Sequence, residues 1–293
     1  MGIGLGAQAH HIHHEIEVPA GTLDWVRVIQ DHAPSPSPNI SLRGEFTRRL
    51  LERYALADKT TVLGCPTHFL SPERNLGATV AERFAQTGVG RVAVAAGHQH
   101  WHHLTALEHS LVGIADQTNG AYICQSPLEM VRLGRLKADL FALSQIPDCH
   151  RYIHPKKSLS DFIDWTRERA YSFFSVPAWM EFLRRFDFVV GTRIHGIILG
   201  LQVGIPSLCI THDSRTEELC HTLKIPSVPA STVASGTTIE QLASLFEFDP
   251  VVFDRNRQHL SAAYAAFLES NGLFPSRHLS GLAGLIPCEP LAL

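Results

Sequence analysis

The chain has 293 residues, of which 45% are hydrophobic and 18% charged, and this composition excludes a disordered or collagen-like protein. At roughly 150 residues per domain, the length suggests two domains. The 25 basic residues are outnumbered by 28 acidic ones, and the net charge of −3 argues against a general nucleic-acid-binding protein. Histidine is unusually frequent, with 18 residues, and only five of the basic residues are Lys.

Short β-rich runs alternate with helical patterns along the chain. Strands are predicted over 2–7, 61–65, 91–96, 121–125, 187–190 and 206–211. Helices are predicted near 45–57, 77–87, 101–117, 126–136, 160–170, 177–185, 194–204, 214–223, 238–246 and 251–269. Residues 144–160 are predicted to be irregular, and the tail after Gly272 to be loose. Strands separated by helices indicate an α/β protein with parallel sheets.

Cysteine usage and the absence of targeting signals predict a cytoplasmic protein. None of the six cysteines forms a C-x-x-C pair, so they are interpreted as buried thiols in a reducing compartment. The first residues lack the basic leader and long apolar run of a signal peptide. The most apolar stretch, 194–210, is interrupted by polar residues and glycines, so no transmembrane segment is expected.

The most informative stretch is 187–219, which contains two successive strand–loop–helix units. Ligands of parallel sheets bind outside the carboxyl ends of the strands, where helix N-termini favour anions. Arg193 and His195 lie where the first helix begins, and Ser214-x-x-Glu217 predicts a capping box for the second. Arg215 would then lie in the first turn, opposed to the helix dipole, either as a surface residue or as a ligand contact. We expect His195 and Arg215 to face one crevice.

Four segments of the chain, in order, resemble the polysaccharide pyruvyl transferase family. Within GTRIHG the chain has the Arg-x-His-Gly motif of that family, and GIPSLCITHDSRTEEL has its Gly-x-Pro strand and its Asp-x-Lys or Asp-x-Arg turn. Upstream, SLRGEFTRRLLERYAL and VLGCPTHFL resemble two further family segments. MGIGLGAQ resembles the strand and glycine turn that precede them. The resemblance covers about residues 1–225.

The resemblance implies a GT-B-like fold of two Rossmann-like domains with parallel sheets and a site in the cleft between them. The expected bounds are 1–88 for the N-terminal domain, 89–248 for the C-terminal domain, and 249–293 for a helix and tail that pack back on the first domain. Family members usually have more chain before MGIGLGAQ, so a first domain without its opening strands is expected. A sheet of this kind exposes an edge and an apolar face, which predicts poor solubility or a homodimer.

The resemblance also implies the reaction, which transfers pyruvate from phosphoenolpyruvate to two sugar hydroxyls as a cyclic ketal in exopolysaccharide or cell-wall glycan synthesis. The acceptor would be a glycan or a lipid-linked sugar, and phosphoenolpyruvate would be a co-substrate, with no metal and no other cofactor. His195 would be the general acid/base, while Arg43 and Arg215 would hold phosphate and carboxylate. Several family members have Lys at the position of Arg215. The remaining substrate-binding residues implied are Thr192, Arg193, Gly196 and Asp213.

Several alternatives remain open at this stage. Arg193 either joins the anion site or ties its loop to the domain interface. The clusters AHHIHHE and GHQHWHH match no defined metal spacing and are interpreted as polar loops, and GIGLGA is only a weak dinucleotide-binding match. A GT-B nucleotide-sugar glycosyltransferase would need a carboxylate for the ribose, for which Glu217 and Glu218 are the candidates. The other alternative is a non-catalytic, truncated paralogue that binds an anionic sugar.

Overall fold

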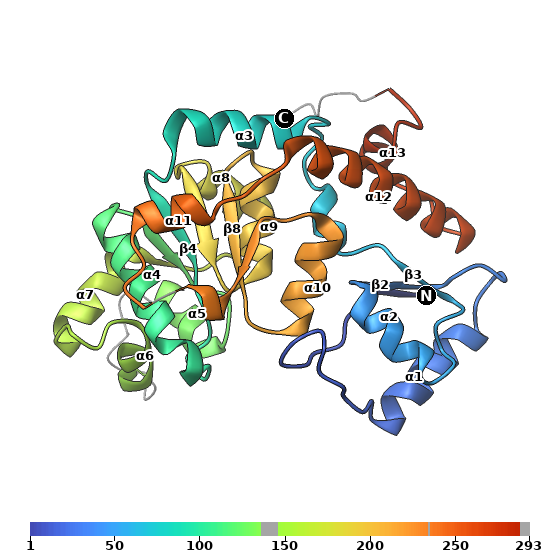
Figure 1. Cartoon of the computed structure of the whole chain (residues 1–293), viewed down its shortest axis with the longest axis horizontal. Coiled ribbons are helices and arrows are strands. Elements are labelled where there is room, and N and C mark those ends of the chain that lie inside the picture. The colour runs from blue at the N-terminus through green and yellow to red at the C-terminus, as the bar shows by residue number, and fades with distance from the viewer. Residues whose placement is uncertain (136–145, 234, 288–293) are drawn as a thin grey trace. The chain divides into compact units, whose positions relative to one another are not determined.

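The computed structural model describes residues 1–135, 146–233 and 235–287, and Figure 1 shows the course of the chain. The chain divides into two compact units. The first consists of Met1–Ala78, His212–Ile225 and Asp249–Leu293, and the second of Thr79–Thr211 and Pro226–Phe248. Residues 212–225 therefore group with the first unit, whereas the sequence pattern placed them within 89–248.

The first unit is built on a three-stranded parallel sheet in the order β1-β2-β3. Its strands are β1 (Gly2–Leu5), β2 (Ile40–Leu42) and β3 (Thr60–Val62). Its helices are α1 (Ala20–Asp31), α2 (Glu45–Glu52), η1 (Pro66–Phe69), α10 (Ser214–Leu223), α12 (Pro250–Ser270) and α13 (Arg277–Leu282). The buried side chains between this sheet and α1 and α2 are Leu23, Val26, Ile40, Leu42, Leu51 and Leu56.

The second unit is built on a six-stranded parallel sheet in the order β6-β5-β4-β7-β8-β9. Its strands are β4 (Val92–Ala95), β5 (Ala121–Ile123), β6 (Ala170–Tyr171), β7 (Phe188–Gly191), β8 (Ser207–Thr211) and β9 (Ser227–Pro229). Its helices are η2 (His102–Leu104), α4 (Thr105–Gln117), α5 (Leu128–Arg135), α6 (Ile146–Ile153), α7 (Leu159–Arg169), α8 (Val176–Leu183), α9 (Ile194–Gln202), η4 (Ala230–Thr232) and α11 (Ile239–Leu245). Helix α3 (Leu76–Thr87) begins in the first unit and continues into the second. Two parallel sheets alternating with helices confirm the predicted α/β class.

Of the α-helices in the described ranges, three lie where the sequence pattern predicted none. Helix α6 lies within the stretch expected to be irregular, of which residues 144 and 145 fall outside the described residues. It buries Ile146, Cys149 and Ile153, but eight residues are too few for this periodicity to stand out in the sequence. Helix α13 lies in the tail expected to be loose, where Ser276 caps it, and α1 follows Pro19 in a polar segment.

Burial of the cysteines agrees with their prediction as thiols. Cys65, Cys124, Cys149, Cys209 and Cys220 are all buried and free, while Cys288 lies outside the described residues. In the ranges that the structure describes, none of the helices combines the length and the apolar character needed to cross a membrane.

Arg257 of α12 is buried in the first unit and fastens this helix to the loop that follows β3. Its side chain is 1% exposed. The guanidinium donates to the carbonyl oxygens of His68 at 2.9 Å and Glu73 at 2.6 Å, and to that of Ser71. One side chain therefore satisfies three backbone acceptors of a segment without regular hydrogen bonding.

We expect Arg257→Met to lower the free energy of unfolding by at least about 3 kcal/mol, because it leaves three backbone carbonyls without their donors. Chemical denaturation monitored by circular dichroism measures the change. Arg255→Met is the matched control, since Arg255 lies exposed on the same helix and should change stability by no more than about 0.5 kcal/mol. Equal effects of the two substitutions would contradict this role.

His68 makes the stability of the first unit depend on pH. Its ring is fully buried and lies 5.2 Å from the Phe253 ring, centroid to centroid. Burial, followed by the charge of Arg257, lowers the pKa of His68 from 6.5 to about 3. The folded state therefore binds fewer protons than the unfolded state between these two values, and stability falls as the pH drops below 6.5.

Between pH 6.5 and about pH 3, we expect the charging of His68 to lower the free energy of unfolding by about 1.4 kcal/mol for each pH unit of acidification. His68→Phe removes the titrating group, so urea unfolding from pH 7 to pH 5 should show a shallower loss of stability in the variant than in the parent chain. Substitution of the exposed His259 by Phe should leave the parent slope in place. A slope shared by the parent and His68→Phe would refute the assignment.

Candidate active site

The carboxyl edge of the six-stranded sheet has a topological switch point between β4 and β7. From β4 the chain continues to β5 and β6 on one side and then returns to β7 on the other. Ligands of open parallel sheets bind in the crevice that such a reversal leaves. The loops that meet there are 96–101 after β4, 124–127 after β5 and 192–193 after β7.

The turn after β7 depends on glycine. Gly191 has a φ of +154°, and a Cβ there would lie 2.1 Å from the carbonyl oxygen of Ala95 on β4. A Cβ on Gly196 would lie 2.7 Å from the Cβ of Ala95. The two glycines therefore let α9 begin directly against β4, with Arg193 as its N-cap residue and His195 in its first turn.

Arg193 is held between the loops that follow β4 and β5. Its Nη2 donates to the Ser126 hydroxyl, and its guanidinium carbon lies 4.6 Å from the centroid of the Trp101 ring. The His98 ring stacks on Trp101 at 5.4 Å between centroids. Burial and then the charge of Arg193 lower the pKa of His98, which favours its neutral form. Arg193 thus occupies a fixed position at the start of α9.

A buried carboxylate that the sequence analysis did not identify anchors the loop after β4. Glu108 is fully buried and accepts from the Gly97 backbone N–H at 3.0 Å, the Tyr122 hydroxyl at 2.5 Å and the Tyr152 hydroxyl at 3.3 Å. Burial raises the pKa of Glu108 and also those of both phenols. The sequence did offer a signal for its burial. Glu108 lies four residues after Leu104 and three before Leu111, at the spacing of one helix face, and both leucines are buried.

In the first unit, the glycine turn after β1 frames Arg43. The Nε of Arg43 donates to the Gly4 carbonyl at 3.0 Å, and its backbone N–H donates to Leu5 at 2.8 Å. A Cβ on Gly6 would lie 2.8 Å from the Cδ of Arg43, so only glycine fits there without displacing that side chain. These contacts give GIGLGA a local structural function in positioning Arg43, just before α2.

The N-terminus of α10 differs from its prediction. Asp213, and not Ser214, is the N-cap residue, and its capping box is formed with Thr216 instead of Glu217. The aspartate accepts from the Thr216 N–H at 2.8 Å and also from Gln8 at 3.0 Å. The box lies one residue before the predicted one because Asp213 has the extended backbone of an N-cap residue, whereas Ser214 is already the first residue of the helix. The predicted Ser214–Glu217 box was therefore wrong.

The new cap leaves Arg215 in the first turn of α10, as predicted. Its side chain is half-buried, and its Nε is buried without a hydrogen-bond partner among the residues that the structure describes. Neighbouring Ser214 is bonded to the glycine-turn segment, since its hydroxyl accepts from the Ala9 N–H at 2.8 Å. The segment after β1 and the start of α10 are therefore fastened together inside the first unit.

Glu218 connects α10 to α2. Its carboxylate accepts from the Thr47 N–H at 2.9 Å and from the Thr47 hydroxyl at 2.6 Å. Burial raises the pKa of Glu218, while these hydrogen bonds and the charges of Arg43 and Arg49 act in the opposite direction. The carboxylate is thus engaged in holding two helices and is not presented for a ribose.

The candidate site residues divide between the units. Arg43, Asp213 and Arg215 lie in the first, and residues 192–196, with Thr192, Arg193, His195 and Gly196, lie in the second. Within the first unit, the charge of Arg43 acts on the carboxylate of Glu218 in α10 and opposes the rise in its pKa that burial causes. The expectation that His195 and Arg215 face one crevice involves both units and stays a prediction, as do the roles of these residues.

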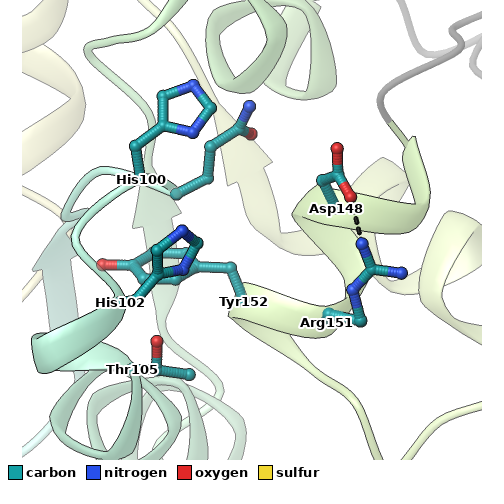
Figure 2. A pocket seen from close by; sticks show the side chains of 7 residues that line it. His100, His102, Thr105, Asp148, Arg151 and Tyr152 are labelled. Atoms are coloured by element: carbon teal, nitrogen blue, oxygen red, sulfur yellow. Dashed lines mark hydrogen bonds and ion pairs between the residues drawn. The ribbon is translucent and has the colours of Figure 1, made fainter.

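A polar pocket of about 420 Å³ lies behind the carboxyl end of β4. Figure 2 shows His100 and His102 on one side of it and the Asp148–Arg151 ion pair on the other. Thr105 at the start of α4 and the ring of Tyr152 also line it. Among the residues in the described ranges, no group of three or more His, Cys, Asp or Glu side chains is placed to hold a metal ion.

Comparison with protein families gives a single result. The family model for polysaccharide pyruvyl transferase matches residues 29–214. Comparisons with curated proteins and with solved structures found no match. The family match covers more than half of the chain and contains Arg43, Arg193 and His195. The chain therefore belongs to the polysaccharide pyruvyl transferase family.

Proposed function

We propose that the chain transfers pyruvate from phosphoenolpyruvate to two hydroxyls of a sugar, forming a cyclic ketal on a glycan or lipid-linked acceptor for exopolysaccharide or cell-wall synthesis. Family membership supports a transferase of this kind. One observation carries the proposal. Arg43 precedes the N-cap residue of α2, Arg193 is the N-cap residue of α9, and Arg215 is in the first turn of α10.

Three guanidinium groups at helix N-termini are an arrangement that anions stabilise. The free N–H groups of a helix N-terminus already carry partial positive charge, so an arginine there is unfavourable by a few tenths of a kcal/mol. An anion bound at the same place reverses the sign of that interaction. Phosphoenolpyruvate carries a phosphate and a carboxylate, and arginine binds both in a bidentate manner.

His195 is the group that we assign to the proton transfers. In the proposed reaction two sugar oxygens form bonds to C2 of phosphoenolpyruvate, and the bond from C2 to the bridging phosphate oxygen breaks. One of the two hydroxyl protons is delivered to the methylene carbon, which becomes a methyl group, and the other leaves with phosphate. Imidazole titrates near neutrality and can accept a proton from one hydroxyl and donate it to the methylene carbon.

The pocket behind β4 supports a sugar acceptor. Its lining combines donors and acceptors from His100, His102 and Thr105 with the Asp148–Arg151 pair. Such a mixture suits the hydroxyls of a sugar, each of which both donates and accepts hydrogen bonds. A nucleotide-sugar glycosyltransferase is less well supported, because Glu218, one of the two carboxylates considered for the ribose, is already bonded to Thr47.

We expect His195→Gln to lower kcat by about 10²–10⁴-fold, because it removes the titrating group but keeps a polar side chain of similar reach. Phosphate release from phosphoenolpyruvate in the presence of a panel of glycosides measures the rate. His259→Gln, an exposed substitution on α12, should retain the parent rate. Turnover by His195→Gln at the parent rate would refute the role of His195.

Donor binding can be measured without a known acceptor. We expect Arg43→Gln and Arg215→Gln each to weaken phosphoenolpyruvate binding at least tenfold in isothermal titration calorimetry, since each loses a charged bidentate contact. Arg215→Lys keeps the charge and should bind more tightly than Arg215→Gln, as expected from the lysine of other family members. Donor affinity that is unchanged in both glutamine variants would rule out these arginines as the anion contacts.

A further inference from the structure

The opposite edge of the six-stranded sheet has a small pocket that the proposed reaction does not use. It encloses about 130 Å³ and lies where β4, β5 and β6 begin, and thus at the amino edge of the sheet. Three arginines line it, namely Arg91 directly before β4, Arg169 directly before β6 and Arg185 after α8. In a parallel sheet this edge is the far one from the loops that carry Arg193 and His195.

Each of the three guanidinium groups is held in place by the surrounding fold. The Nε of Arg91 donates to the Asn119 carbonyl at 2.8 Å, and its guanidinium carbon lies 4.8 Å from the centroid of Phe186. The Nη1 of Arg169 donates to the Asn119 side chain and to the Gly120 carbonyl at 3.2 Å.

Arg185 stacks over the ring of Phe182, with 5.2 Å between its guanidinium carbon and the ring centroid. Stacking on an aromatic face leaves the in-plane N–H donors of a guanidinium available. The carbonyl contacts use only the Nε of Arg91 and the Nη1 of Arg169.

The charges of these arginines are not balanced by acidic side chains. In the part of the chain that the structure describes, none of the three guanidinium groups lies within 4.0 Å of a carboxylate, although those of five other arginines do. The Asp187 carboxylate accepts from the backbone N–H of Arg91 at 2.8 Å. The contrast is local, because Arg167 pairs with Asp164 and Arg184 pairs with Glu181.

Glu168 is the one acidic residue in the pocket lining, which leaves an excess of two positive charges. Like charges that converge on one pocket repel each other, and an anion between them removes this cost. Bonds to the carbonyls of Asn119 and Gly120, which follow α4, account for part of the arrangement at Arg91 and Arg169. They do not account for Arg185.

We propose that this pocket binds a phosphate group, either as inorganic phosphate or as the phosphate of a monoester. The planar fork of arginine matches the oxygens of a phosphate, and three forks supply more donors than one phosphate can accept. The volume is well below the roughly 300 Å³ at which pockets for drug-sized ligands begin, so only the phosphate group itself is enclosed. The proposal does not depend on the pyruvyl transfer reaction.

The test is calorimetric titration with potassium phosphate against potassium chloride of equal ionic strength, in the Arg43→Gln background. That background weakens the proposed donor site but keeps Arg193 and Arg215, so binding at the pocket is read as the part of phosphate binding that depends on Arg169 and Arg185. We expect Arg169→Gln and Arg185→Gln each to weaken this part at least fivefold, and the double variant to abolish it. Their matched controls, Arg167→Gln and Arg184→Gln, should stay within twofold of the background.

A further variant separates binding from a merely structural role. Glu168→Gln removes the one acidic group of the lining, so we expect it to tighten phosphate binding about threefold. Titration with glucose 1-phosphate identifies the source, since tighter binding than that of inorganic phosphate indicates a monoester. The absence of phosphate binding, its survival in the double variant, or weaker binding in Glu168→Gln would each overturn the proposal.

Discussion

Parallel strand pairing decides which side chains meet in each unit of this protein. It brings every segment that follows a strand to one edge of a sheet and every segment that precedes a strand to the other. In the second unit, this places Arg193 and His195 at the carboxyl edge, beside the switch point between β4 and β7. The same constraint gathers Arg91 and Arg169 at the amino edge. One sheet therefore carries basic side chains at both of its edges.

Two buried carboxylates, one in each unit, fix the positions of the loop after β4 and of the start of α2. Glu108 holds the loop after β4 through the Gly97 N–H, and Glu218 holds the start of α2 through the Thr47 N–H. Burial raises the pKa of both groups, and in each case hydrogen bonds to backbone and hydroxyl donors act against that shift. Both units thus use an interior acid to position a segment that adjoins a candidate site arginine, Arg43 in the first unit and Arg193 in the second.

Local patterns in the sequence were sufficient to predict much of the fold and the family. The strands and helices over 187–219 depend on neighbours a few residues apart, and they were predicted correctly. The Arg-x-His-Gly motif is equally local and indicated the family. Contacts between distant segments were not predictable in this way. The buried partners of Glu108, the bond between Gln8 and Asp213, and the convergence of Arg91 on Arg169 all join residues that only the folded chain brings together. Whether Asp213 or Ser214 is the N-cap residue depends on the backbone conformation of one residue, which the sequence pattern did not specify.

Transfer of pyruvate by His195 and the three arginines, as proposed, differs from hydrolysis of a phosphate ester in the bond that breaks. The most direct measurement uses phosphoenolpyruvate labelled with oxygen-18 in the bridge between C2 and phosphorus, with mass spectrometry of both products. Pyruvyl transfer breaks the bond from C2 to that oxygen, so we expect the label in inorganic phosphate and none in the ketal. Label retained on free pyruvate would show cleavage at phosphorus and would rule out pyruvyl transfer.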